Sequence, residues 1–407
     1  MNVVTMSSAQ SETPATGPAP LEGLRVVDFT QVMMGPSATQ TLGDMGADVI
    51  KVERAGAGDL SRLVVPADEG MPGNAIFCSL NRNKRSLSIN LRSEEGKAVV
   101  HKLIASADVV VNNFRPGVMA RLGLDYETLS AANPRLIYAE GTGFGSSGPY
   151  EHKGGQDVLA QAMSGVMARK SDPKTPTTIY ATTLCDYTAG MHMVQAILAA
   201  LLQREKTGRG QRVEVSLYDS MLAMQMQEAA AWLNQGEDLN WGAMPLTGVF
   251  ETADGALVLV GAFKENPLRD ICTALEIEDL SPSYPDLESQ RQHRETIQTR
   301  FREAFRTNST AHWLDRLEDQ DLLCAPVKTL AEALDDEQTA VNGMVVDCPL
   351  PGGRAMRVLG QPVHMSDAPL AIRQAPPGLG EHSSQILAEL GYEQAEIARL
   401  KDGGVVE

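Results

Sequence analysis

Several features of common protein classes are scarce in this sequence. It holds only five cysteines, widely scattered and without a C-x-x-C pair, which argues against a disulfide framework and favours a reducing cytoplasm. The longest uncharged apolar run, residues 187–202, is too short to cross a bilayer comfortably and contains His192 and Gln195. Positive charge is also scarce: 35 Lys and Arg against 52 Asp and Glu leave a net charge of −17. So negative a surface argues against a nucleic-acid or anionic-membrane partner.

Several catalytic signatures are missing as well. The seven histidines show no metal-ligand spacing, and neither a G-x-S-x-G elbow nor a P-loop lysine motif occurs, so no metal site is expected. Residues 1–20 are rich in Ser, Thr, Ala and Pro and lack the basic and apolar regions of a signal peptide. We therefore expect a disordered tail there.

The remaining chain alternates strand and helix patterns, which predicts an α/β fold with a parallel, Rossmann-like sheet. Residues 24–30 (LRVVDFT), 47–53 (ADVIKVE), 108–114 (DVVVNNF) and 133–145 read as strands, with helical spacing between them. Together with the length of 407 residues, the patterns predict two domains. A large domain is expected over 21–234, a smaller α+β domain over 235–330, and a return to the large domain with C-terminal helices over 331–407.

Within these limits, a helix is expected from Asp186 to about Glu205, with Gly208 at its stop. A Met-rich helix is predicted over 220–234, and a hairpin with Asp254-Gly255 at its turn opens the small domain.

A glycine-rich loop follows the strand pattern that ends near residue 142. Its spacing of Gly143, Gly145 and Gly148 matches G-x-G-x-x-G, so a nicotinamide or flavin site has to be considered. A dinucleotide fingerprint must open a helix, however, and here the loop-forming stretch PYEHKGGQD follows. The loop still allows the backbone to approach a ligand closely.

Cations gather near probable strand ends. Glu53 and Arg54 stand side by side at the end of the second strand. An acid at this position binds a bare ribose and an arginine binds a phosphorylated one, so position alone does not decide between them. Arg54 is equally well interpreted as a solvated surface charge. Further cations are Arg82, Lys84, Arg85, Arg115 and Arg121. In so acidic a chain, this clustering indicates a phosphate-bearing ligand.

The stretch CDYTAGMHM opens the long helix and places Asp186 beside Cys185. By position Asp186 reads as an N-cap that accepts the free amides of Thr188 or Ala189. In a functional reading, the positive helix end keeps the same carboxylate ionised for attack on an activated acyl group. Cys185 is an alternative nucleophile, although buried free cysteines are commoner. His192 lies about 240° around the helix from Asp186 and cannot face it.

Seven segments of the sequence resemble the family III CoA-transferases, the group that includes formyl-CoA and carnitine CoA-transferases. They are LEGLRVVDFTQVMMGPSATQTLGDMGADVIKVER, LNRNKRSLSINL, NNFRPGVMARLGLDYETLSAANPRLIYAEGTGFGSSGPY, DVLAQAMSGVM, CDYTAGMHM, LLQREKTGRGQRVEVSLYDS and LGEHSSQILAELGY. The resemblance spans nearly the whole chain after Leu21 and is weakest between about 230 and 345.

The resemblance implies specific roles. The family's nucleophilic aspartate falls on Asp186, and no tightly bound cofactor is expected, because the CoA thioester is itself the substrate. The implied CoA contacts are Val32, Met33, Arg54, Leu80, Lys84, Asn113, Phe114 and Arg121. We also expect Gly143 and Gly145 to contact CoA, and backbone amides of the loop from Gly143 to Gly148 to bind the oxyanion, with Gln156 as a side-chain helper. The family's subunits interlock, so a cytoplasmic, interlocked homodimer is expected.

The sequence also departs from its relatives. Met33 and Thr142 stand where the formyl-CoA enzyme has glutamine and lysine, and NWGAMPLTG lacks that enzyme's glycine run, which argues against oxalate as acceptor. Gln156 stands where related α-methylacyl-CoA racemases have a histidine, so racemisation would lack one of two bases.

We therefore expect an acyl-CoA:carboxylate CoA-transferase, with a small dicarboxylate or hydroxy acid as acceptor and succinyl-CoA as an implied donor. A racemase, a CoA-ester lyase or hydrolase and a non-catalytic CoA-binding protein are the alternatives.

Overall fold

The computed structural model describes residues 17–67, 69–172 and 174–407, so residues 1–16 of the predicted tail lie outside it. The chain divides into two compact units. The first contains the described residues up to Ser164, Ala181–Met224 and Val341–Glu407, and the second contains Gly165–Tyr180 and Gln225–Ala340.

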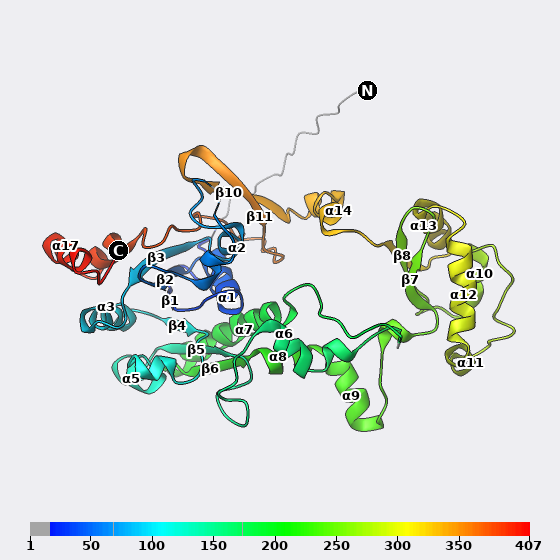
Figure 1. The fold of residues 1–407 in the computed structure, drawn as a ribbon, viewed down its shortest axis with the longest axis horizontal. Helices are drawn as coiled ribbons and strands as arrows, with labels where there is room; N and C mark the ends of the chain where they lie inside the picture. The colour runs from blue at the N-terminus through cyan, green and yellow to red at the C-terminus, as the bar shows by residue number, and fades with distance from the viewer. Residues whose placement is uncertain (1–16, 68, 173) are drawn as a thin grey trace. The chain divides into compact units, whose positions relative to one another are not determined.

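A six-stranded parallel sheet forms the centre of the first unit, as the alternating sequence pattern predicts (Figure 1). Its strand order is β3 (Lys84–Ile89), β2 (Asp48–Arg54), β1 (Arg25–Asp28), β4 (Val109–Asn112), β5 (Ile137–Thr142) and β6 (Arg212–Ser216). The order reverses between β1 and β4. In open parallel sheets such a reversal opens a crevice beyond the carboxyl ends of the strands, where ligands bind.

Helices cover both faces of this sheet. On one face, the long helix α7 (Leu184–Thr207) packs against α1 (Met34–Asp44), and the two lie side by side in Figure 1. On the other face, side chains of α3 (Glu94–Ala105), α5 (Tyr126–Ala132), α16 (Ser383–Glu389) and α17 (Gln394–Asp402) share one apolar core with the strands. Burial on both faces explains why the strands read as continuous β-branched runs.

Smaller elements complete the first unit. They are η1 (Leu60–Leu63), α2 (Ala75–Leu80), α4 (Val118–Arg121), α6 (Asp157–Met163), α8 (Leu217–Met224) and the antiparallel pair β10 (Val345–Leu350) and β11 (Arg354–Leu359).

The second unit has its own core around a three-stranded antiparallel sheet. Its strands are β7 (Thr247–Glu251), β8 (Ala256–Val260) and β9 (Leu323–Pro326), covered by α10 (Pro267–Ala274), α12 (Arg294–Phe305) and α13 (Thr310–Asp319). The predicted hairpin is confirmed, with Asp254-Gly255 between β7 and β8. Its remaining helices include α9 (Met226–Gln235), α11 (Leu287–Gln292) and α14 (Leu330–Leu334).

Two helix predictions have clear outcomes. Gly208 ends α7 in the left-handed conformation, at φ 72°, as predicted. The single Met-rich helix over 220–234 is wrong, because the chain forms α8 and α9 with a break at Gln225.

Candidate active site

A pocket of about 520 Å³ lies beyond the carboxyl ends of β1, β4 and β5, at the strand-order reversal. Its wall is formed by Gln31, Val32, Met33, Met34, Leu60, Asn113, Phe114, Arg115, Pro116, Gly141, Thr142, Gly143, Phe144, Gly145, Glu151, Lys153, Gly154, Gly155, Gln156, Leu159, Asp186 and Leu217. This is the position in which open parallel α/β sheets bind their ligands.

The turn after β1 forms one side of the pocket and is held in an unusual conformation. Val32 has φ 68°, a left-handed value that a β-branched residue rarely adopts. Its N–H donates to Asp59 Oδ1 at 3.1 Å. The adjacent Gln31 exchanges two hydrogen bonds with the side chain of Asn113, at 2.9 and 2.8 Å, which ties this turn to the loop after β4.

Beneath that turn lies a layer of fully buried charges. Lys51 Nζ pairs with Asp59 at 2.8 Å, and Lys84 Nζ pairs with Asp28 at 3.2 Å; the four side chains are 0 % exposed. Burial acts to raise the pKa of Asp28, but Lys84 and Lys51 hold it below its ordinary value. For Lys84, burial prevails over the attraction of Asp28 and lowers the pKa to about 8. The layer supports the pocket from behind.

Asp186 is the third residue of α7, whose N-cap is Thr183. The reading of Asp186 as the N-cap is therefore wrong by three positions. The first turn of α7 is positioned by close packing of α7 against α1. A Cβ at Gly190 would overlap Ser37 Oγ and the carbonyl oxygen of Met34, so a glycine is needed where the two helices approach. The cap role falls to Asp157 from α6, whose Oδ1 accepts the N–H groups of Cys185 at 2.7 Å and Asp186 at 3.0 Å.

The ionisation of Asp186 also differs from the sequence-based expectation. Burial, together with the charge of Asp157, raises the pKa of the Asp186 carboxyl to about 6. The helix end therefore does not depress this pKa, because a second carboxylate already occupies the amides there. At neutral pH Asp186 is still mostly ionised.

Neither Cys185 nor His192, the other reactive side chains of CDYTAGMHM, competes with Asp186 as the nucleophile. Burial, followed by the charges of Asp157 and Asp186, raises the pKa of the Cys185 thiol to about 12, so the thiolate that a nucleophilic cysteine needs is absent. His192 Nδ1 lies 3.0 Å from Ser220 Oγ and is not part of the pocket wall.

The glycine loop forms the other side of the pocket. Gly145 has φ 99° and donates its N–H to Thr142 Oγ1 at 3.0 Å, while Gly143 packs against Gly155 so tightly that neither position admits a Cβ. No helix begins at Gly148, and the next helix, α6, starts only at Asp157. The loop therefore lacks the helix that a dinucleotide fingerprint must open. The loop thus exposes backbone rather than a helix end.

The predicted site residues separate into two groups. The structure brings together on the pocket wall Val32, Met33, Asn113, Phe114, Gly143, Gly145, Gln156 and Asp186. Outside that wall lie Arg54, Leu80, Lys84 and Arg121. Arg54 and Arg121 are exposed, and Lys84 is bound to Asp28 in the buried layer, so its ammonium is not presented to the pocket.

Two wall cations were not among the predicted CoA contacts. Arg115 lies over Gly154, and Lys153 Nζ lies 5.6 Å from the Tyr150 ring centroid and 5.9 Å from that of Phe144. Arg115 directly follows the Asn113-Phe114 pair, so adjacency was a signal for it. In the sequence Asp157 is only the acid that follows Gln156. Its capping of α7 depends on a hydrogen bond to the Asp186 N–H, 29 residues away, which no local pattern indicates.

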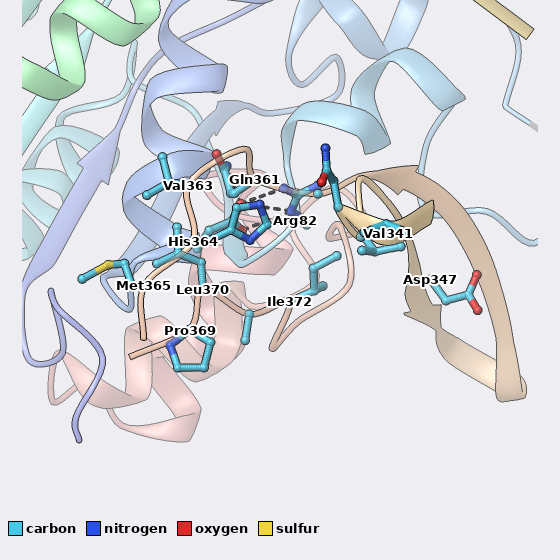
Figure 2. Close-up of a pocket in the computed structure, with 16 residues that line it drawn as sticks. Arg82, Val341, Asp347, Gln361, Val363, His364, Met365, Pro369, Leu370 and Ile372 are labelled. Carbon is cyan, nitrogen blue, oxygen red and sulfur yellow. Dashed lines mark hydrogen bonds and ion pairs between the residues drawn. The ribbon is translucent and has the colours of Figure 1, made fainter. Parts of the chain in front are cut away.

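A second pocket, of about 450 Å³, lies between Arg82, the segment 341–347 and residues 360–372 (Figure 2). Arg82 is already paired with Asp44 at 2.7 Å, and Gln361 donates to the same carboxylate at 2.6 Å. The arginine of this pocket is therefore already neutralised by Asp44. Among the described residues, no cluster of His, Cys, Asp and Glu suits a metal ion. Nor does any described helix have the length and apolar character required to cross a bilayer.

A half-buried carboxylate beside a glycine-rich loop, at the switch point of a parallel sheet, defines an α/β enzyme site suited to acyl-group chemistry. The sequence family agrees: residues 21–383 match the model of CoA-transferase family III. The chain belongs to that family and is a CoA-transferase.

Two curated relatives and one solved structure illustrate the similarity. An acyl-CoA transferase from Fusarium pseudograminearum is 34% identical, covering 98% of this chain and 91% of that protein. Succinyl-CoA:glutarate CoA-transferase from Mus musculus is 35% identical, covering 95% and 90%. The crystal structure of a CAIB/BAIF family protein from Brucella suis aligns with a TM-score of 0.82 at 32% identity, over 92% of this chain and all of that one.

Proposed function

We propose that this CoA-transferase moves CoA from an acyl-CoA donor to a carboxylic acid through covalent intermediates on Asp186. The Asp186 carboxylate attacks the thioester carbonyl, the carbon–sulfur bond breaks, and CoA thiolate leaves with the electron pair, giving an acyl-aspartyl anhydride. The thiolate attacks the aspartyl carbonyl and releases the first acid, which leaves an aspartyl-CoA thioester. The acceptor carboxylate then attacks this thioester to form a new anhydride, and the thiolate attacks its acyl carbonyl to release product and free Asp186.

The observation that carries this proposal is the placement of Asp186 on the pocket wall with a pKa near 6. A carboxylate in this state is ionised at neutral pH, and its partial burial removes part of its solvation. Both properties favour attack on a thioester. No general base is required, because neither attacking group carries a proton.

The neighbouring groups have natural roles in such a reaction. The amide of Gly143, with Gln156 nearby, would donate to the oxygen that becomes negative in each tetrahedral intermediate, whereas the Gly145 amide is already bound to Thr142 Oγ1. Arg115 and Lys153 supply positive charge for CoA phosphates in an otherwise acidic chain. Val32, Met33, Asn113 and Phe114 line the same pocket, while contacts from Arg54, Leu80, Lys84 and Arg121 stay predictions.

For the substrates, we propose succinyl-CoA as donor and a small dicarboxylate as acceptor. Support comes from the relative named for succinyl-CoA and glutarate, which is similar to this chain over 95% of its length.

Transfer and the covalent intermediate are testable together. The protein is incubated with succinyl-CoA and a panel of carboxylates, CoA esters are followed by mass spectrometry, and hydroxylamine is added to trap an activated aspartate. We expect a new CoA ester, a hydroxamate on Asp186, and loss of both in Asp186→Ala. Undiminished transfer by that variant would overturn the mechanism.

The same assay separates the alternatives. Solvent deuterium appearing at the α-carbon of a branched acyl-CoA would indicate a racemase. Thioester loss without any acceptor would indicate a lyase or hydrolase, and CoA binding with no acyl group on Asp186 would indicate a binding protein. Glu205→Gln, an exposed change on α7, serves as the matched control and should transfer CoA like the wild type.

We also propose a cytoplasmic, interlocked homodimer. Helix α9 has no buried residue, and it exposes Trp232 and Leu233 at 63% and 80%. An amphipathic helix with large apolar side chains in water is typical of a surface that another subunit covers. The five free cysteines suit a reducing compartment. Light scattering should give twice the mass of the 43.8 kDa chain.

A further inference from the structure

The first turn of α7 is held by a residue from another helix. The first four N–H groups of a helix have no partner within it, and the N-cap residue of α7, Thr183, makes no side-chain capping hydrogen bond. Asp157 provides the missing acceptor. Its Oδ1 accepts the N–H groups of both Cys185 and Asp186, 28 and 29 residues away along the chain.

The Asp157 carboxylate is itself firmly placed. It is the first residue of α6, only 6% exposed, and its Oδ2 accepts a hydrogen bond from Gln161 at 2.6 Å, one turn further along the same helix. With one oxygen held by α6 and the other on the backbone of α7, it connects the two helices at the turn that carries Asp186. The connection ends on the Asp186 backbone, not on its reactive side chain.

We propose that Asp157 is a positioning residue that holds the first turn of α7, and with it the Asp186 carboxylate, in register with the pocket. The inference rests on the proposed role of Asp186 as the nucleophile. A misplacement of about 1 Å in such a group lowers a rate on the order of 100-fold. Loss of an ordinary helix cap, in contrast, lowers stability and has no reason to change a rate.

Charge gives Asp157 a second effect on the same group. Burial comes first among the causes that raise the pKa of Asp186 to about 6, and the Asp157 charge adds to it. Other ionisable groups around the pocket are Arg115 and Lys153, which favour the ionised form, and Glu151, which opposes it; Cys185 stays neutral. Since Asp157 contacts the Asp186 main chain directly, removing its charge should lower the pKa of Asp186.

Three variants separate positioning from simple capping. Asp157→Ala removes both the acceptor and the charge, whereas Asp157→Asn keeps an oxygen acceptor and removes the charge. Asp125→Ala is the matched control, because Asp125 caps α5 through the N–H of Thr128, at 3.0 Å, away from the pocket. Each is measured for unfolding midpoint, kcat, KM for succinyl-CoA and the acid limb of kcat/KM against pH.

We expect Asp157→Ala to lower kcat about 100-fold with KM changed less than about threefold. Asp157→Asn should retain more activity and move the acid limb to lower pH, while Asp125→Ala should lose stability alone. If Asp157→Ala keeps the wild-type kcat, or if the acid limb of Asp157→Asn does not move, the inference is wrong. Should the alanine variant not fold, the asparagine variant decides by its pH profile.

Hydroxylamine trapping distinguishes failure of this inference from failure of the proposed function. If wild-type protein forms no hydroxamate on Asp186, the proposed nucleophile is wrong. If the wild type and Asp157→Ala both form it at the same rate, Asp186 is the nucleophile and Asp157 does not position it. A slow hydroxamate in Asp157→Ala alone supports the inference.

Discussion

Asp59 Oδ1 accepts the N–H of Val32, whose backbone has the strained φ of 68°, while the same carboxylate is paired with the buried Lys51. A pocket-wall turn is thus tied to an ion pair below it. Residues in such backbone conformations persist only where their surroundings hold them, and they cluster at functional sites.

Asp59→Asn should therefore lower the free energy of unfolding by about 3 kcal/mol, because it leaves the buried Lys51 without one of its partners. Denaturant unfolding measures the change. Glu95→Gln, which breaks an exposed pair with Arg399, is the control and should change stability by less than about 1 kcal/mol. Equal effects of the two substitutions would contradict a structural role for the buried pair.

Gly190→Ala should destabilise the protein, by about 2 kcal/mol or more, although alanine normally favours a helix. The added methyl overlaps Ser37 and the Met34 carbonyl oxygen and forces α7 away from α1. Thermal unfolding tests the sign, and kcat should fall as well because Asp186 is one turn away. A stabilised variant would show that the helices need not approach so closely.

Activity should depend on pH through Asp186. Since the nucleophile must be ionised and its pKa lies near 6, kcat/KM should rise with pH and level off above about pH 7. Stopped assays with succinyl-CoA across pH 4.5 to 8 give the profile. An acid limb near pH 4, the ordinary range of an aspartate, would contradict the effect of burial and of Asp157 on this group.

Asp186→Asn should make the inactive protein more stable at neutral pH. A carboxyl whose pKa is higher in the folded state than in the unfolded state destabilises the fold at any pH at which the unfolded chain has released the proton. The penalty is absent below the ordinary pKa, grows up to about pH 6, and is constant above it. The asparagine variant should therefore gain about 1 to 3 kcal/mol at pH 8 and little at pH 4. Equal effects at both pH values would argue against this explanation.

Cys185→Ala should keep transfer activity within about twofold of the wild type, because a thiol with a pKa of about 12 supplies no thiolate at neutral pH. Iodoacetamide should likewise leave the native enzyme active, since Cys185 is fully buried. A tenfold or greater loss of kcat in Cys185→Ala, with the fold intact by circular dichroism, would give the thiol a chemical role.

Local patterns were enough to predict much of the fold. The β-branched runs from Arg25 to Asp28 and from Val109 to Asn112 had to be strands of a covered parallel sheet, and Gly208 marked a helix end, because each depends on neighbours in the chain. The break at Gln225 escaped prediction, since the sequence on both sides continues to favour helix.

Strand patterns alone indicated which side chains stand at the ends of the strands, and the family resemblance pointed to Asp186. The burial of Lys84 against Asp28, the capping of α7 by Asp157 and the raised pKa of Asp186 became visible only once the chain was folded. The reason is physical: burial and contacts between charges far apart in the chain set ionisation and position, and neither is encoded in local spacing.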